Sequence, residues 1–345
     1  MRDMRMLSRR VVFKKAKEVA IEEIDIPSPS HGQILVKTLV TLISTGTELT
    51  VLSGEFPKGS VWDKITRYPG MPGYSNCGVV EEVGEEVQNL NVGDRVVSDA
   101  HHSEYSLVRE DGAFRVPRGV SDEEATFWNL SATVLNGVRL ANIRLGESVA
   151  VVGAGILGQL ACQYSRLCGG FPVIVVDLSE MRLKIARKLG ATAVIQSGKD
   201  DVAERVSELT KGRGADVIFE VTGNQNNIPW ELDLVKPQGR FILLSSPRGT
   251  TTLDFHDYLN WPSRIVIGTH ASSHPAYETP YNPWTRQRNT ELFFDLLDAK
   301  LVNVKELITH RYPWTEAREV YRKLLDPVGE RLQVIGVLLD FRERP

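Results

Sequence analysis

Apolar and polar positions alternate over short distances in the first third of the chain. Through residues 10–120, short runs of β-branched residues are separated by Gly, Pro and Asp, a pattern typical of strands joined by turns. The clearest runs lie at residues 34–40, 78–83, 94–97 and 105–108. We therefore expect a β-rich domain at the N-terminus.

The apolar spacing becomes helical at residue 122. Residues 122–140 repeat apolar positions at helical spacing, and acidic residues occupy positions 122–124, where the positive end of a helix dipole favours them. This change of pattern predicts a helix and a domain boundary near residue 125.

Residues 148–270 alternate buried strands with amphipathic helices. The expected strands lie at residues 148–152, 173–177, 193–195, 216–221 and 240–245, and the expected helices at residues 156–167, 180–189 and 201–210. Such alternation predicts right-handed βαβ units, and hence a parallel sheet covered by helices on both faces.

Residues 270–289 interrupt this alternation with prolines and aromatic residues. Beyond them we expect helices at residues 290–300 and 315–325, and strands near residue 311 and at residues 333–339. The last strand could return to the N-terminal domain. The expected division is therefore one domain of residues 1–125 and 290–345 and a second domain of residues 126–289.

Composition and charge narrow the function. The chain has 345 residues, with 41 Lys and Arg against 44 Asp and Glu, so its net charge of −3 gives no field that favours nucleic acid or an anionic membrane. No run of about 18 apolar residues could span a bilayer, and the basic start lacks the apolar core of a secretory signal. Three Cys without CxxC spacing favour a reducing compartment. We expect a cytoplasmic protein whose partner is a small molecule.

A glycine-rich turn separates the strand at residues 148–152 from the following helix. Gly153, Gly155 and Gly158 form a GxGxxG motif, with Ile156 and Leu157 at the start of the helix. The first glycine permits a tight turn, the second lets the backbone approach a pyrophosphate, and the third lets helix and strand pack closely. In this context the motif predicts a dinucleotide site.

Asp177 ends the next strand, 19 residues beyond Gly158. A carboxylate there would accept hydrogen bonds from the adenosine ribose diol and repel a 2′-phosphate. Arg182 could instead accept such a phosphate, or pair with the acid. We therefore expect NAD as the cofactor, with NADP as the alternative.

Several further segments together resemble the medium-chain dehydrogenase/reductase superfamily over nearly the whole chain. They are Pro72-Gly73, residues 78–84, residues 92–96, Ser103-Glu104-Tyr105, residues 145–147, residues 216–223 and residues 308–311. The resemblance implies a doubly wound Rossmann sheet that binds NAD(P), a β-rich GroES-like catalytic domain formed by both termini, an active site in the cleft, and a homodimer or homotetramer.

The chain departs from that family at the zinc ligands. Thr45 stands at the position of the first Cys ligand, Tyr74 at that of the His ligand, and Asn129, beside Trp128, at that of the third ligand. Only residues 98–102 stand where the family's structural-zinc lobe needs four Cys. We therefore expect no metal. Residues 44–48 (Ser-Thr-Gly-Thr-Glu) and 72–74 (Pro-Gly-Tyr) more narrowly resemble a zinc-lacking branch of the superfamily that includes bacteriochlorophyllide dehydrogenase.

Two adjacent histidines leave an alternative metal site open. His101 and His102 would point to opposite faces of a strand, and we expect a solvent-exposed pair. A shifted site that uses His101, Glu48 or Cys77 remains the alternative.

Without zinc, another group must take the proton of the alcohol. By resemblance, Thr47 relays that proton, and Thr45 and Tyr74 could hydrogen-bond the reacting oxygen. Glu48, with its usual histidine partner replaced, could be a buried base or the partner of an Arg, and His270 is the histidine best placed to act as a base.

The remaining expected contacts also follow from the resemblance. Val221 and Thr222 should line the cofactor, and backbone groups of Ser245 and Thr269 should meet its carboxamide. The expected substrate-pocket residues are Trp62, Trp128, Asn129 and Trp284. The aromatic faces of the three tryptophans suit a sugar or cyclitol. For the aromatic insertion, a contact between subunits is the alternative.

These observations favour an NAD-dependent, zinc-independent oxidoreductase that oxidises a secondary alcohol of a polyol, sugar, cyclitol or similar bulky metabolite. The first alternative is a zinc-free NAD(P)H-dependent reductase of enones or quinones, which the acid at position 177 opposes. The second is a protein that binds the cofactor without turnover.

Overall fold

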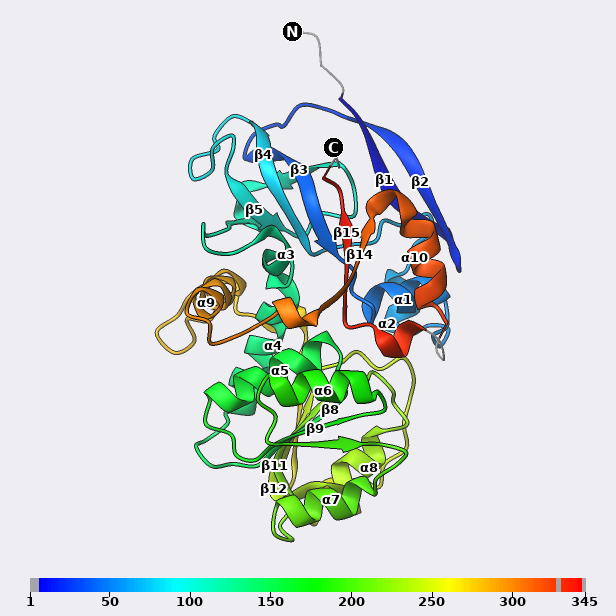
Figure 1. The fold of residues 1–345 in the computed structure, drawn as a ribbon, viewed down its shortest axis with the longest axis vertical. Coiled ribbons are helices and arrows are strands. Elements are labelled where there is room, and N and C mark those ends of the chain that lie inside the picture. The colour runs from blue at the N-terminus through cyan, green and yellow to red at the C-terminus, as the bar shows by residue number, and fades with distance from the viewer. Residues whose placement is uncertain (1–5, 327–329, 343–345) are drawn as a thin grey trace. The chain divides into compact units, whose positions relative to one another are not determined.

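The computed structural model describes residues 6–326 and 330–342, and within it the chain forms two compact units. Unit 1 comprises Met1–Asn129, Thr290–Asp298 and Ile308–Pro345, and unit 2 comprises Leu130–Asn289 and Ala299–Leu307 (Figure 1). The α/β fold class expected from the sequence is confirmed. Residues 299–307 pack with unit 2, whereas the sequence pattern assigned them to the first domain together with the rest of residues 290–345.

Unit 2 is built on a six-stranded parallel sheet (Figure 1). Its spatial order is β10 (Ala193–Gln196), β9 (Val173–Asp177), β8 (Val149–Val152), β11 (Ala215–Glu220), β12 (Val235–Leu243) and β13 (Ile265–Gly268). The connecting helices are α5 (Ile156–Leu167), α6 (Glu180–Lys188), α7 (Val202–Leu209) and α8 (Ile228–Asp233). The order reverses beside β8, and ligands of such sheets bind where the order reverses.

Unit 1 contains a seven-stranded sheet in which both ends of the chain meet. Its spatial order is β14 (Ile308–Pro313), β15 (Gly336–Asp340), β3 (Gln33–Leu42), β4 (Asn76–Val83), β5 (Arg95–Ser98) and β7 (Ala113–Arg115), and β6 (Tyr105–Arg109) also pairs with β3. The final apolar run therefore returns to the N-terminal strands, as its composition suggested.

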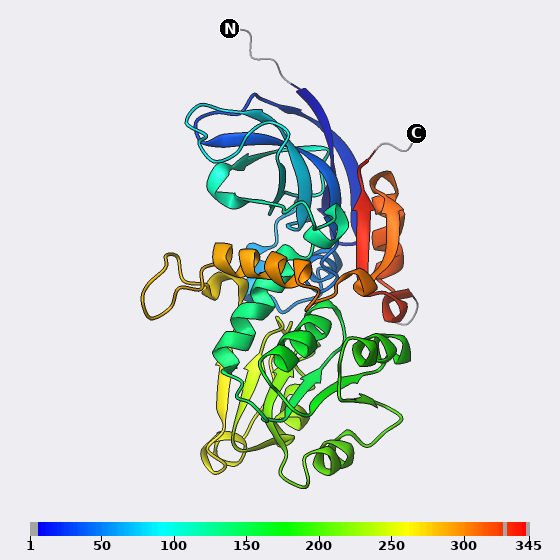
Figure 2. The ribbon, with the colours of Figure 1, turned by 60° about the vertical axis from the view of Figure 1, so that its left-hand side comes forward.

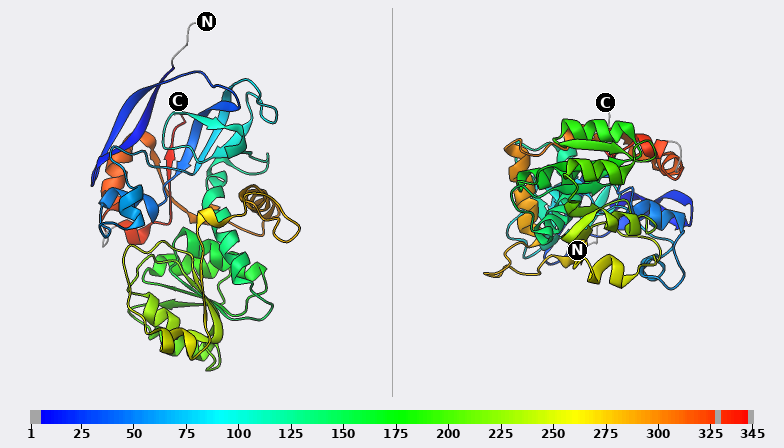
Figure 3. Two further views of the ribbon diagram at one scale, coloured as in Figure 1. Left: turned by 180° about the vertical axis from the view of Figure 1, so that it is seen from behind. Right: turned by 90° about the horizontal axis from the view of Figure 1, so that it is seen from below.

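A separate hairpin covers part of unit 1. β1 (Met6–Lys15) and β2 (Glu18–Ile26) run antiparallel as one long blue ribbon (Figure 2). Helix α10 (Ala317–Leu324) lies against this hairpin (Figure 3), and Phe13 meets Tyr321 edge to face at a ring-centroid distance of 5.1 Å. Helix α1 (Thr47–Ser53) contributes Leu49 and Leu52 to the same apolar core.

The helix expected at residues 122–140 is two helices. α3 (Asp122–Ala125) begins with a capping box between Ser121 and Glu124, and α4 (Trp128–Ala141) follows after a break. The remaining helices are α2 (Val61–Ile65) and α9 (Arg286–Asp298).

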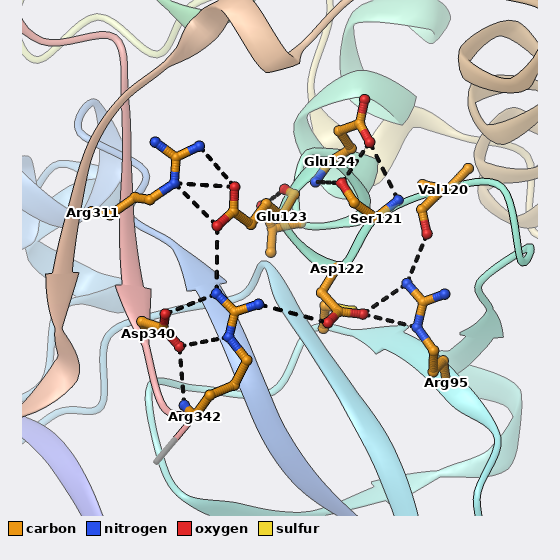
Figure 4. Close-up of polar contacts among 11 residues, drawn as sticks. Arg95, Val120, Ser121, Asp122, Glu123, Glu124, Arg311, Asp340 and Arg342 are labelled. Carbon is orange, nitrogen blue, oxygen red and sulfur yellow. Dashed lines mark hydrogen bonds and ion pairs between the residues drawn. The ribbon is translucent and has the colours of Figure 1, made fainter. Parts of the chain in front are cut away.

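The acidic residues of α3 bind arginines of both the C-terminal and the N-terminal segments of unit 1 (Figure 4). On the N-terminal side, Asp122 accepts a hydrogen bond of 2.8 Å from Arg95 of β5. Glu123 receives a hydrogen bond of 2.8 Å from Arg311 of β14, and Arg342 bridges Glu123 and Asp340 at 3.4 and 2.8 Å. The hydrogen bond from Arg311 lowers the pKa of Glu123. These acids therefore form ion pairs in addition to occupying the first turn of a helix.

No helix in the described ranges is long and apolar enough to cross a membrane.

Candidate active site

The turn from β8 into α5 has the shape that the GxGxxG motif predicted. Gly153 has a φ of +106°, and a Cβ on Gly158 would lie 1.8 Å from the carbonyl oxygen of Gly153, so neither position accepts a larger residue. A Cβ on Gly155 would meet nothing within 4 Å. Protein atoms therefore leave no room for a side chain at the first and last glycines of the turn. The second glycine faces open space, through which a pyrophosphate would approach.

Asp177 is fixed against this turn. Its two carboxylate oxygens accept hydrogen bonds from the backbone N–H of Ala154 at 2.6 Å and of Ser179 at 2.7 Å. The nearest Arg182 nitrogen lies 3.9 Å from it, and burial lowers the pKa of that guanidinium. The acid and the arginine therefore form a partly buried pair at the end of β9, where an adenosine ribose would bind.

Glu220, which the sequence analysis did not single out, organises the loop after β11. One of its oxygens accepts hydrogen bonds from the backbone of Thr222 at 2.7 Å, from the Thr222 hydroxyl at 2.5 Å and from the backbone of Gly223 at 3.0 Å, and the other from the Ser245 hydroxyl. A Cβ on Gly153 would lie 3.1 Å from the carbonyl carbon of Val221. Glu220 thus holds the predicted cofactor residues Val221 and Thr222 against the glycine-rich turn.

Ser245 and Thr269, the two residues expected to contact the carboxamide, donate their backbone N–H groups to carbonyl oxygens of unit 2. That of Ser245 donates to the carbonyl of Glu220 at 3.1 Å, and that of Thr269 donates to the carbonyl of Leu243 at 3.0 Å.

In unit 1, three hydroxyl groups meet at the start of α1, and we call Ser44, Thr47 and Tyr74 the hydroxyl cluster. The Tyr74 hydroxyl donates to the Ser44 hydroxyl, and the nearby Thr47 side chain opposes the rise in the pKa of Tyr74. Burial, and then the nearby carboxylate of Glu48, raises the pKa of Tyr74 to about 12. Thr45 and Thr47 are half-buried. The cluster is therefore uncharged at neutral pH.

Beneath the cluster, Glu48 is anchored by three donors. It is 3% exposed and accepts hydrogen bonds from the backbone of Ser44 at 2.8 Å, from Nε2 of His102 at 3.0 Å and from the Tyr321 hydroxyl. Nδ1 of His102 lies 2.7 Å from the Thr41 hydroxyl.

Two expectations about these residues were wrong. His102 is fully buried, so the adjacent histidines are not a solvent-exposed pair, and Glu48 does have a histidine partner, supplied by the segment after β5. His101 is half-buried, and its Nδ1 donates to the carbonyl of Gly73 at 2.8 Å.

Of the expected substrate residues, Trp62, Trp128 and Asn129 lie in unit 1 and Trp284 lies in unit 2. Trp128 is fully buried and packs on Phe114 at 5.2 Å between ring centroids, so its assignment to a substrate pocket was wrong. Asn129 is 7% exposed and donates to the carbonyl of Tyr74 at 2.7 Å, a supporting contact for that residue. Trp62 is half-buried on α2, and Trp284 is stacked with the guanidinium groups of Arg139 and Arg288. His270, the other predicted base, is exposed and pairs through Nδ1 with the Ser272 hydroxyl.

The chemistry of the donor set does not suit zinc. Hydroxyl and amide groups of Thr45, Tyr74 and Asn129 replace the expected thiolates and imidazole. Burial strongly raises the pKa of the Cys77 thiol, which opposes the thiolate that zinc needs. Within residues 6–326 and 330–342, no three His, Cys, Asp or Glu side chains are grouped to hold a metal ion.

Two family models match the chain. The alcohol dehydrogenase GroES-like domain matches residues 30–127, and the zinc-binding dehydrogenase domain matches residues 157–284. An L-threonine 3-dehydrogenase of Pyrococcus furiosus is 29% identical, with 92% of this chain and 97% of the relative covered. A sorbitol dehydrogenase of Halalkalibacterium halodurans is 27% identical, with 93% and 96% covered.

Solved structures have the same fold. A putative zinc-binding dehydrogenase of Sinorhizobium meliloti bound to NADP has a TM-score of 0.81 at 23% identity, with 97% of this chain and 99% of that chain covered. An alcohol dehydrogenase of Escherichia coli complexed with NADH has a TM-score of 0.82 at 20% identity, with the same coverage of 97% and 99%. The two family models and the relatives identify the chain as an oxidoreductase that belongs to the medium-chain dehydrogenase/reductase superfamily.

Proposed function

We propose that this protein is a zinc-independent dehydrogenase that uses NAD to oxidise a secondary alcohol of a polyol, sugar, cyclitol or similarly bulky metabolite. The observation that carries the proposal is the hydroxyl cluster: Tyr74, at the position of the expected histidine ligand, donates a hydrogen bond to Ser44 beside Thr47.

Unit 2 supplies the cofactor contacts. The open position at Gly155 admits the pyrophosphate, and the N-terminus of α5 stabilises its charge. The carboxylate of Asp177, fixed by Ala154 and Ser179, accepts hydrogen bonds from the ribose diol and disfavours a 2′-phosphate. When bound, the nicotinamide accepts the hydride. Because one structure with the same fold is bound to NADP, the affinities of this protein for NAD and for NADP should be measured first.

Unit 1 supplies the groups for the substrate oxygen. Oxidation removes a hydride from carbon and a proton from the hydroxyl, and Thr47 relays that proton while Tyr74 orients the oxygen through a hydrogen bond. Glu48 already accepts three hydrogen bonds and is almost fully buried, so we assign it to positioning α1 rather than to proton abstraction. His270, an exposed residue of unit 2, stays our predicted base.

The substrate class rests on two observations. The sorbitol dehydrogenase relative acts on a polyol, as its name states. Hydroxyl groups such as those of Thr45, Thr47 and Tyr74 can donate and accept, which matches the alternating donors and acceptors of a polyol.

The test is a thermal-shift titration with NAD and NADP, followed by a panel of polyols, sugars, cyclitols, simple alcohols and enones on the protein loaded with NAD. Ligands that bind the folded state raise the unfolding midpoint. A rise with NAD and a further rise with a polyol, with NADH formed on turnover, supports the proposal. A rise with NADP alone, reduction of enones, or stoichiometric zinc in elemental analysis would overturn it.

A further inference from the structure

Unit 1 contains a cavity of about 610 Å³ that does not involve the hydroxyl cluster. Its walls come from the β1–β2 hairpin, from the loop after β5 and from β6. One part of the wall is apolar and contains Ile24, Ile26, Leu107 and Val108, and another part carries Arg10 and His101. A cavity with an apolar surface and a few converging polar groups is the usual form of a small-molecule site.

Arg10 is half-buried, and its guanidinium has few partners among the described residues. Its Nε atom is buried and has no hydrogen-bond partner among the described residues, and one terminal nitrogen donates to the sulfur of Met71 at 3.0 Å. A thioether is a weak acceptor. The preceding Arg9, in contrast, binds Glu104 with side-chain hydrogen bonds of 2.6 to 3.2 Å. Because a planar guanidinium matches a carboxylate through two parallel hydrogen bonds, Arg10 is suited to an acidic ligand.

His101 adds an uncharged group to the wall. Its Nδ1 lies 2.8 Å from the carbonyl oxygen of Gly73, so the proton sits on Nδ1 and the neutral ring has Nε2 as an acceptor. Burial lowers the pKa of His101, which favours that neutral form at pH 7. The ring therefore adds no positive charge, and Arg10 is the main attraction for an anion.

The acidic residues of the cavity limit the charge of the ligand. Asp25, Asp99 and Asp111 line it, and Asp111 is paired with Arg109, which lines it too, at 3.1 Å. Each carboxylate opposes further negative charge, so a ligand with one negative charge is favoured over phosphate or a dicarboxylate. The apolar side chains in turn favour a ligand with a hydrocarbon body.

We propose that this cavity binds a small monocarboxylic acid, whose carboxylate pairs with Arg10 and whose apolar body packs on Ile24, Ile26 and Leu107. The site is separate from the proposed alcohol site. Since His101 is hydrogen-bonded to Gly73, next to Tyr74, the bound acid contacts a residue that supports the hydroxyl cluster.

The experiment is calorimetric titration of the full chain, without cofactor or alcohol, so that its outcome does not depend on the proposed reaction. The probes are isovalerate and benzoate as monocarboxylates, isovaleramide as the uncharged analogue, and succinate and inorganic phosphate as more highly charged anions. The variants are Arg10→Met, which removes the charge at similar length, Arg10→Lys, which keeps the charge without the planar fork, and Arg9→Met as the matched control.

We expect saturable binding of a monocarboxylate that weakens roughly 10- to 100-fold in Arg10→Met and is unchanged in Arg9→Met, the effect of removing one charged hydrogen-bond partner. Arg10→Lys should bind with intermediate affinity, and it decides the question if Arg10→Met does not fold. The amide and the more highly charged anions should bind at least about tenfold more weakly. No saturable binding of either monocarboxylate, equal affinity in the Arg10 variants and the wild type, or tighter binding of phosphate or succinate would overturn the proposal.

Discussion

The carboxylate of Glu48 accepts a buried hydrogen bond of 3.0 Å from the imidazole of His102, although 54 residues separate them in the chain. The pair joins α1 to the loop after β5, and the hydroxyl of Tyr321 joins it to α10. Three segments of unit 1 are thus held together by one carboxylate directly below the proposed substrate groups.

We predict that His102→Ala lowers the free energy of unfolding by about 1–3 kcal/mol, because it leaves the buried carboxylate of Glu48 without one of its hydrogen-bond donors. Chemical denaturation followed by tryptophan fluorescence measures the change. His101→Ala, on the neighbouring half-buried residue, is the control and should cost less. Equal losses for the two variants would show that the hydrogen bond between His102 and Glu48 has no special role in stability.

Substitutions at two glycines of the glycine-rich turn should distinguish an effect on folding from an effect on cofactor binding. Gly158→Ala places a Cβ 1.8 Å from the carbonyl oxygen of Gly153 and should lower the unfolding midpoint, whereas Gly155→Ala meets no protein atom within 4 Å and should leave it unchanged. We expect Gly155→Ala to weaken NAD binding instead, since the new methyl group occupies the approach of the pyrophosphate. Thermal unfolding and NAD titration measure the two effects, and an unaltered NAD affinity in Gly155→Ala would contradict the assignment.

Features formed by residues close together in the chain could be predicted from the sequence, whereas contacts between residues far apart in the chain could not. Gly153, Gly155, Gly158 and Asp177 lie within one strand–turn–helix–strand unit, so their spacing was sufficient to place them. The hydrogen bond between Glu48 and His102 was missed because it joins residues distant in sequence, and no periodicity reports such a contact.

The errors have the same origin. Trp128 was assigned to a pocket because it lies beside a position that the family uses for zinc, but its burial is set by Phe114 and the rest of the core. The break between α3 and α4 was hidden because the apolar spacing continues across it. The acid at Glu220 could have been noticed, since it ends a buried strand immediately before the loop that carries Thr222.

Asp177 should decide between the two cofactors. Asp177→Ala removes the acceptor for the ribose diol and the repulsion of a 2′-phosphate, so we expect NAD to bind about tenfold more weakly and the preference for NAD over NADP to shrink. Dissociation constants from fluorescence titration measure both changes. Glu180→Gln, an exposed residue three positions further on, is the control and should leave both constants unchanged.

Tyr74 should affect the chemical step more than binding. Tyr74→Phe removes the hydroxyl that donates to Ser44, and we expect kcat to fall by about 100-fold, the low end of acid–base effects, with the affinity for NAD unchanged. Tyr68→Phe is the matched control, because that hydroxyl donates only to the backbone of Val51. An unchanged kcat in Tyr74→Phe would exclude the proposed role for this hydroxyl.

Glu231 should make the stability of the protein depend on pH. It is fully buried on α8, and its two oxygens have no hydrogen-bond partner in the described part of the chain. Burial, and then the carboxylate of Glu220, raises the pKa of Glu231 to about 9, from an ordinary value of 4.5. Between these values the folded protein holds a proton that the unfolded chain has lost. Stability therefore falls as pH rises, by up to about 1.4 kcal/mol per pH unit, and this group contributes no further change above pH 9.

Glu231→Gln keeps the shape and removes the ionisation, so the variant should lose this slope and be more stable than the wild type at pH 8. Urea denaturation at pH values from 5 to about 9, a range in which the wild type and the unfolded chain differ by this proton, measures the slope. Glu204→Gln, on an exposed residue of α7, is the control and should retain the wild-type slope. If Glu231→Gln also retains it, the carboxyl group is not held neutral in the folded protein, and water or a bound group must reach it.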